Sequence, residues 1–169
     1  MPGNKLLLCH CFAVRQAARQ ITRLYEQRLE PLHLTSAQFS ILVRLSEDPG
    51  TPIASLAETL GMDRTTALRA LRPLVRKRLV AAPYPASDGR QLCVALTAKG
   101  SQVLQQARPM WQAAQREFED LAGVSVAQRL RENLLTVAST AQERASRRVR
   151  GRNPKRPVRP SDRGDRPRP

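Results

Sequence analysis

The segment "IASLAETLGMDRTTALRALRPLVRKRLV", Ile53 to Val80, decides the fold. Its first apolar residues recur at helical spacing and meet Gly61, a residue type that commonly ends helices because it tolerates a positive φ. Asp63 follows and can cap a second helix, since its carboxylate accepts hydrogen bonds from the free N–H groups of a first turn. Two helices joined by a tight, glycine-containing turn are typical of a helix-turn-helix motif.

The second helix of this motif has an apolar and a basic face. At about 100° per residue its alanines and leucines gather on one side and its arginines on the other. Such a helix fits the major groove of DNA, where its first turns reach base edges and arginine pairs with guanine. We expect base contacts from Arg64, Thr65, Leu68 and Arg69, and phosphate contacts from Arg72 and Arg76. The alternative is a solvated charged face, the commoner fate of a basic stripe.

A β-hairpin is predicted directly after the basic helix. The segments Val80–Tyr84 and Gln91–Leu96 would pair around an Asp-Gly dipeptide, which is a strong signal for a type I′ turn. Arg90 follows this turn and would reach a neighbouring minor groove as the tip of a wing. The plainer interpretation is a solvated hairpin that only reverses the chain.

Amphipathic helices are expected on both sides of this region. They are Cys9–Leu29, a helix capped by Thr35 and Gln38, one that starts at Thr97, and one capped by Ser125 and Gln128. The apolar stripes of the last two helices exceed what a small DNA-binding core could cover. A partner subunit is the expected cover, which predicts a homodimer.

The charge of the chain favours a polyanionic partner. Lys and Arg outnumber Asp and Glu by 29 to 14, a formal net charge of +15. More than half of this excess lies in Arg147–Pro169, where ten Lys/Arg, two Asp and five Pro occur with almost nothing apolar. This tail cannot bury enough surface to offset its ordering entropy, so we expect it to be disordered. It is either a solubilising tail or a non-specific arm on nucleic-acid phosphates.

Neither a signal peptide nor a membrane span is predicted. The short apolar run near Cys9 flows into an arginine-bearing helical pattern, and no run approaches the roughly 18 apolar residues that a span requires. Three cysteines do not form a disulfide framework, which favours a reducing, cytoplasmic location.

The order of these elements, with "LAETLGMDRTTALRALRPL", "DGR" and "LTAKG", resembles the MarR family of winged-helix transcriptional regulators over roughly Cys9 to Ser146. The resemblance implies a homodimer with intertwined first and last helices, in which each subunit places a helix and a wing on half of a pseudo-palindromic operator. It also implies that Asp88 supports the wing by pairing with a basic side chain and that Arg90 enters the minor groove. Arg78 stands where the family commonly has glycine, so we expect the basic helix to end without a glycine cap.

Cys11 is a candidate redox sensor. "CFA" followed by Tyr25 resembles the organic-hydroperoxide-sensing branch of the family, in which tyrosines hold the thiolate of an oxidisable cysteine. Ser36 and Arg15 stand where that branch has further tyrosines, and the alternative is a buried cysteine of a dimer core. A metal site at Cys9-His10-Cys11 is not expected, because neighbouring side chains on a helix point apart.

The sequence therefore predicts a mainly α fold with a small β-hairpin wing: a winged helix-turn-helix flanked by dimerisation helices. The expected parts are an N-terminal dimerisation helix (1–34), a DNA-binding domain (35–100), C-terminal dimerisation helices (101–146) and a basic tail (147–169). With no catalytic constellation or cofactor motif recognised, we expect a non-enzymatic regulator, in the simplest case a repressor, released from double-stranded operator DNA by a small molecule or a hydroperoxide. The alternative is a protein that binds or compacts nucleic acid non-specifically, with a steep salt dependence.

Overall fold

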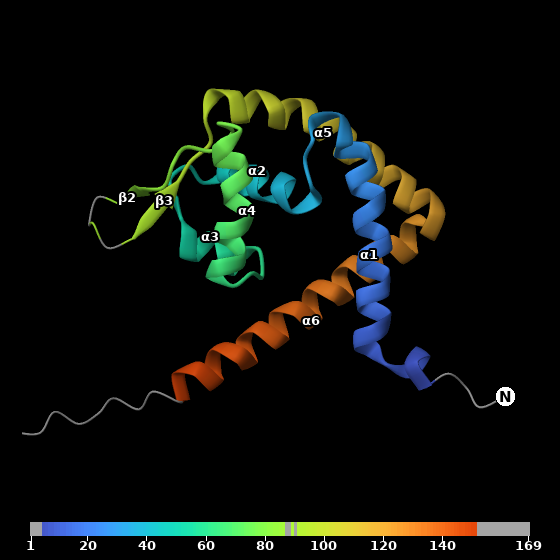
Figure 1. Cartoon of the computed structure of the whole chain (residues 1–169). Coiled ribbons are helices and arrows are strands. Elements are labelled where there is room, and N and C mark those ends of the chain that lie inside the picture. Colours follow the sequence, from blue (N-terminus) through green and yellow to red (C-terminus); the bar gives the residue numbers. More distant parts are fainter. Residues whose placement is uncertain (1–4, 87–88, 90, 152–169) are drawn as a thin grey trace, which may run out of the picture. The chain divides into compact units, whose positions relative to one another are not determined.

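A computed structural model shows a mainly helical chain with one small antiparallel sheet (Figure 1). The structure describes residues 5–86, 89 and 91–151. Two compact units can be distinguished, Met1–Leu130 and Arg131–Pro169, and each is described by itself. The elements are η1 (Lys5–Leu8), α1 (His10–Leu29), η2 (Glu30–Leu32), α2 (Ser36–Glu47), β1 (Thr51–Pro52), α3 (Ile53–Thr59), α4 (Arg64–Arg76), β2 (Tyr84–Pro85), β3 (Leu92–Val94), α5 (Ala98–Ala122) and α6 (Val124–Gly151).

Helices α1 and α5 contact each other extensively within the first unit. The Tyr25 hydroxyl donates to Oε1 of Gln115, and Arg28 forms an ion pair with Glu117 at 2.7 Å. Helix α1 ends at Leu29, as predicted, two residues before Pro31. The 3₁₀ turn η2 follows and includes this proline.

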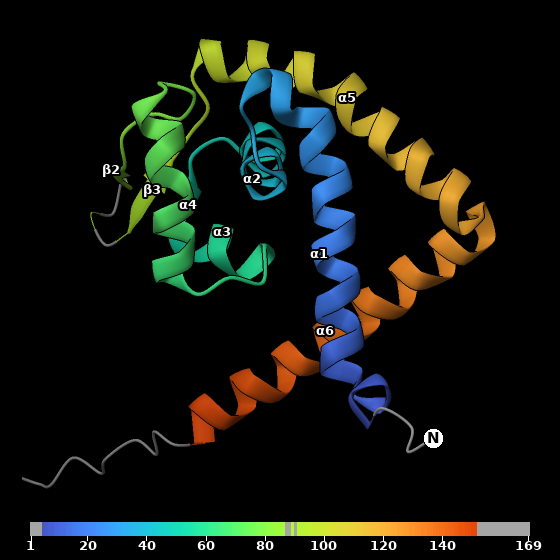
Figure 2. The same ribbon diagram turned by 45° about the vertical axis from the view of Figure 1, so that its right-hand side comes forward.

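Helix α2 lies at the centre of the first unit, between α1 and α4 and below α5 in Figure 2. The predicted capping box is present: Thr35 Oγ1 accepts from the Gln38 N–H, and Gln38 Oε1 accepts from the Thr35 N–H, both at 3.2 Å. The side chains of Phe39, Ile41, Leu42 and Leu45 are buried. These residues form much of the core of the first unit.

The predicted helix-turn-helix is formed by α3 and α4. Gly61 adopts a left-handed φ of 62° in the turn, and the Met62 N–H donates to the Ala57 carbonyl at 2.8 Å. Asp63 caps α4, because its Oδ1 accepts from the Thr66 N–H at 2.8 Å. Both helix boundaries in this motif agree with the sequence prediction.

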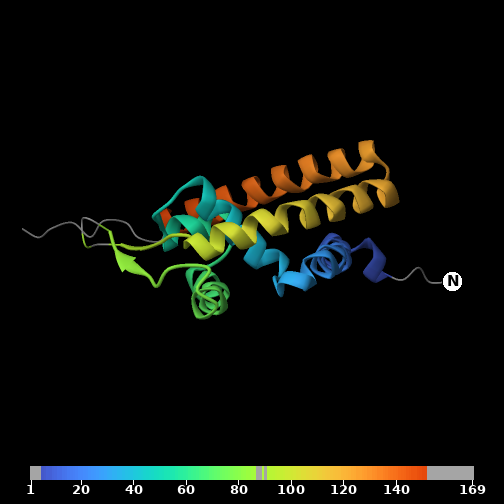
Figure 3. The same cartoon turned by 90° about the horizontal axis from the view of Figure 1, so that it is seen from above.

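The sheet has three strands in the order β1-β3-β2, whereas the sequence predicted only the hairpin. Thr51 of β1 pairs with Val94 of β3, a contact that needs two segments distant in sequence. In the hairpin, Tyr84 pairs with Cys93, and the Ala86 N–H donates to the Gln91 carbonyl at 2.8 Å. The hairpin projects away from the helices of its unit, as seen from above in Figure 3.

The carboxyl end of α4 uses arginine where glycine is common. Arg78 has a φ of 59°, its N–H donates to the Val75 carbonyl at 2.9 Å, and the Leu79 N–H donates to the Leu74 carbonyl at 2.9 Å. This pair of hydrogen bonds is a Schellman motif with a left-handed residue just past the helix. The prediction that the helix ends without a glycine cap is confirmed, and Arg78 itself adopts the strained conformation.

The predicted start of the last helix was wrong by a residue or two. Gly123 has a φ of 83° and ends α5, and its carbonyl accepts from the N–H groups of Val126 and Ala127. Helix α6 therefore begins at Val124, and Ser125 lies inside its first turn rather than at the cap. The glycine sets the boundary because it can take the left-handed conformation between two helices without strain.

Helix α6 continues to Gly151, past the predicted boundary at Ser146. Three of the five residues past that boundary are arginine, which favours a helix, and the first proline comes only at Pro154. The remaining tail, 152–169, lies outside the described residues. In the described part of the chain, none of the helices combines the length and apolar character needed to cross a bilayer.

Candidate nucleic-acid interface

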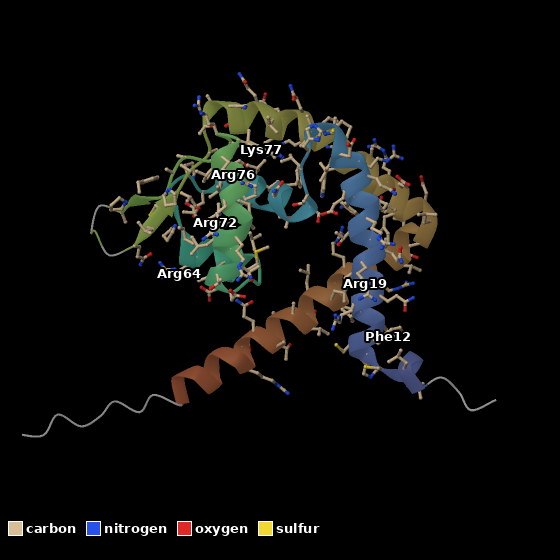
Figure 4. All side chains as sticks on the ribbon, in the orientation of Figure 1. Phe12, Arg19, Arg64, Arg72, Arg76 and Lys77 are labelled. Carbon is tan, nitrogen blue, oxygen red and sulfur yellow. The ribbon has the colours of Figure 1, made fainter. Side chains whose placement is uncertain are left out.

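Helix α4 has one face in the core and one face in solvent. Ala67, Leu71 and Leu74 are no more than 2% exposed. The residues predicted to contact DNA occupy the other face: Leu68 is half-buried, and the exposed ones are Arg64, Thr65, Arg69, Arg72 and Arg76. Figure 4 shows Arg64, Arg72 and Arg76 following one another along the helix. The division into two faces agrees with the sequence prediction.

The arginines of α4 keep their charge available. Within the described part of the chain none of them forms an ion pair, whereas Arg28 pairs with Glu117 and Arg44 with Asp48. A groove of about 790 Å³ lies between α4 and Pro83, the residue before β2. Arg69, Arg72 and Arg76 line its helix side. A groove with this charge suits the phosphate backbone of a nucleic acid.

The Asp63 cap fixes the amino end of α4 beside the predicted base-reading residues. The Thr66 N–H, and after it the Thr66 hydroxyl, hold the pKa of the Asp63 carboxyl below its ordinary value of 3.8. The positive charge of Arg69 acts in the same direction. The carboxylate is therefore ionised near neutral pH. Its negative charge also interacts favourably with the positive, amino end of the helix dipole.

The wing residues can be placed only in part. Gly89 is exposed with a φ of 66°, as expected for the tip of a hairpin. Asp88, the predicted wing support, and Arg90, the predicted minor-groove residue, lie outside the described residues.

Comparison with known proteins identifies the family. The MarR family model matches residues 34–92, which include the helix-turn-helix and the hairpin as far as the first residue of β3. The M. tuberculosis transcriptional regulator MosR, solved in complex with DNA, is 34% identical with a TM-score of 0.71, over 80% of this chain and 97% of that one. The chain belongs to the MarR family.

Two further transcriptional regulators are similar to this MarR family chain. The transcriptional repressor CouR is 25% identical to this chain, with a TM-score of 0.72 over 82% of this chain. It has been solved bound to a 23-mer DNA duplex, where 98% of that chain is covered, and bound to p-coumaroyl-CoA, where 97% is covered. The organic hydroperoxide resistance transcriptional regulator of Bacillus subtilis is 25% identical over 91 residues, 54% of this chain and 62% of that protein. These relatives are transcriptional regulators and not enzymes. The chain is a winged-helix, DNA-binding transcriptional regulator.

The candidate redox residues of this MarR family chain are not brought together. Cys11 is exposed near the start of α1, and Tyr25 is half-buried in the same helix, where it donates to Gln115. Fourteen residues separate them, about 21 Å along a helix, so one chain cannot place its own Tyr25 on its Cys11. Cys9 is also exposed, and Cys93 is buried within strand β3 of the hairpin. Among the described residues, no group of three His, Cys, Asp or Glu side chains could hold a metal ion.

A cavity whose lining residues the sequence did not single out opens between α2, the end of α3 and α5. Its volume is about 370 Å³, and the stacked rings of Phe39 and Trp111, 5.9 Å apart, form part of its wall. Arg44 and Arg108 lie at its polar side, and Arg44 is already paired with Asp48 at 2.9 Å. Sequence patterns could not reveal it, because the same apolar spacing predicts a filled helix interface.

Proposed function

We propose that two copies of the chain bind a pseudo-palindromic operator and act as a repressor. The observation that carries this proposal is the row of arginines on the exposed face of α4, which form no ion pair among the residues that the structure describes. The helix itself is fixed by its cap and its buried face. Among the relatives, CouR is named as a repressor and is bound to DNA. In each subunit α4 would enter the major groove, and the hairpin would lie along the flanking DNA.

The residues of α4 divide by position. Arg64, Thr65, Leu68 and Arg69 lie on its first two turns and would contact base edges, with Leu68 suited to a thymine methyl group. Arg72 and Arg76 lie further along the helix and would contact phosphates. Arg90 would enter the minor groove, with Asp88 as the support of the wing.

Exposed apolar side chains favour a homodimer. Leu121 of α5 is 75% exposed, and Leu135 and Val137 of α6 are 64% and 66% exposed. Ile21, Leu24 and Phe118 help to line an open groove of about 320 Å³ between α1 and α5. Apolar surface of this kind usually marks a protein interface, and a second copy of the same helices would cover it symmetrically.

The cavity between α2, α3 and α5 is the proposed site of a small-molecule effector. Its aromatic wall fits a flat apolar ligand, and Arg108, unpaired among the described residues, would bind an anionic group. Thr59 and Leu60 line it and directly precede the turn that leads to α4. A ligand here would therefore alter the position of the proposed DNA-reading helix.

Oxidation of Cys11 is the second proposed signal. The exposure of its thiol and the similarity to a hydroperoxide resistance regulator support it. Hydroperoxide would convert the thiolate to a sulfenic acid, with reduction of the peroxide to an alcohol. Because Tyr25 is remote within one chain, its contact with Cys11 would have to form between subunits.

Selection of bound sequences from random DNA tests the central proposal. Recovery of an inverted repeat is expected, and Arg69→Ala should weaken operator binding by about 1–3 kcal/mol and relax the preference at one base. Arg116→Ala, an exposed arginine of α5, is the matched control and should keep both affinity and preference. Recovery of unrelated sequences would favour the non-specific alternative.

The two signals are separated by variants. Hydroperoxide should release wild-type protein from the operator, while Cys11→Ser should bind DNA normally and ignore the oxidant; Cys9→Ser and Cys93→Ser should still respond. If Cys11 stays unmodified by mass spectrometry and DNA is retained, the redox signal is refuted. Release by an aromatic acid that fails with Arg108→Ala would then support the cavity.

A further inference from the structure

Lys77 makes a long-range contact that the arginines of α4 do not make. It is the residue that follows Arg76 at the carboxyl end of α4, and its Nζ donates to the backbone carbonyl of His33 at 2.6 Å. His33 lies between η2 and α2, 44 positions earlier in the sequence. In Figure 4, Lys77 lies at the opposite end of α4 from Arg64. This contact joins the end of α4 to the junction between α1 and α2.

The carbonyl that receives Lys77 is held in place by its own surroundings. His33 has a left-handed φ of 51°, and its N–H donates to the Glu30 carbonyl at 2.7 Å. The neighbouring Leu34 and the preceding Leu29 are 3% and 0% exposed. The junction is therefore anchored in the core, and the acceptor has a defined position.

Other donors secure the chain just beyond α4. Lys99 Nζ donates to the Lys77 carbonyl at 3.1 Å, and Thr97 Oγ1 donates to the Arg78 carbonyl at 2.7 Å. Helix carboxyl ends present free carbonyls and a partial negative charge, so cationic donors are favoured there. Lys99 and Thr97 tie this end to the start of α5, whereas Lys77 ties it to the α1–α2 junction.

We propose that Lys77 is a positioning residue for operator recognition. It acts through the His33 carbonyl and without contacting DNA: it holds the carboxyl end of α4, so that Arg64 and Arg69 at the other end keep their approach to the bases. Binding groups need to be held within about 0.5 Å and 10–20° of the productive geometry, so one contact at the end of a helix can matter. The inference rests on the proposed function, in which α4 reads the operator.

The test compares Lys77→Met, which keeps the aliphatic stem but has no donor, with Lys77→Arg, which can still donate to the carbonyl. Binding of the full chain to the selected operator and to a scrambled duplex is measured by fluorescence anisotropy at several salt concentrations. Lys77→Met should lower the preference for operator over scrambled DNA by about three- to tenfold, the effect of about one net hydrogen bond. The slope of log K against log salt should not change, and Lys77→Arg should restore most of the preference.

Two results would overturn the inference. A loss of affinity on both duplexes, with a slope reduced by about 0.9 for each subunit, would mean that Lys77 contacts phosphate. Arg76→Met, a proposed phosphate contact, is the control that should show this behaviour. An unchanged preference, with or without a lower Tm, would mean that Lys77 serves stability alone or has no role. Arg69→Ala is measured in parallel: if it too has no effect, the proposed function fails rather than this inference alone.

Discussion

Replacement of Gly100 by alanine tests how closely α5 packs on the segment that follows α4. A Cβ at position 100 would lie 2.0 Å from the Leu79 carbonyl oxygen, 2.9 Å from its carbon and 3.1 Å from Leu96 Cδ2. The same carbonyl oxygen accepts from the Thr97 N–H at 3.1 Å. Backbone atoms cannot turn aside as a flexible side chain can. The methyl group therefore has to displace the segment or the helix.

The expected cost follows from these contacts. Loss of this hydrogen bond costs about 1 kcal/mol, and overpacking in a core typically costs about 1–3 kcal/mol. Alanine is better than glycine inside a helix by about 0.5–1 kcal/mol, which offsets part of the loss. We expect Gly100→Ala to lower the free energy of unfolding by about 1–3 kcal/mol.

Urea unfolding followed by circular dichroism measures this difference, at one fixed protein concentration because a dimer gains stability with concentration. Ser101→Ala is the matched control: this residue is exposed in the same turn of α5, and its replacement should change stability by no more than about 0.5 kcal/mol. A Gly100→Ala protein within about 0.5 kcal/mol of wild type would refute the packing argument.

Three more predictions follow from other parts of the chain. Arg78→Gly should raise the free energy of unfolding by about 0.5–1 kcal/mol, because a left-handed non-glycine residue costs about 1–2 kcal/mol. Part of this gain is offset because glycine loses more backbone entropy on folding. A lower Tm for the variant would contradict the prediction. The lowered pKa of Asp63 stabilises the fold above pH 3.8, and this contribution is lost as the pH falls through the folded-state pKa. Wild type should therefore lose stability more steeply in acid than Asp63→Asn, which keeps a cap but cannot titrate. Equal acid unfolding curves for the two proteins would count against this prediction. Deletion of residues 152–169, with seven Lys/Arg and two Asp, should flatten the salt dependence of non-specific DNA binding and leave operator preference intact, whereas loss of dimerisation would show a structural role.

Local chemistry let the sequence predict most of the helices and the two faces of α4. The Thr35–Gln38 capping box and the Asp63 cap involve residues three positions apart, so the hydrogen bonds that form them are encoded in a single turn. The separation of buried and exposed residues on α4 follows in the same way from a spacing of 3.6 residues per turn. The candidate base-reading surface was therefore visible before the fold was known.

Features that need distant segments could not be predicted. Strand β1 has two residues and no alternating pattern, and it is a strand only because β3 lies beside it. The start of α6 could not be predicted to the residue, because several polar or flexible residues could have ended α5. The cavity beside Phe39 and Trp111 depends on how two helices approach each other.

The sequence by itself determined the helix-turn-helix, its caps and its basic face, because these depend on neighbours within one or two turns. Only the tertiary structure decided that the Leu79 carbonyl lies where Gly100 leaves room and that Lys77 reaches His33. A backbone carbonyl is the same group in every residue, so no residue pattern marks which one a distant side chain will meet.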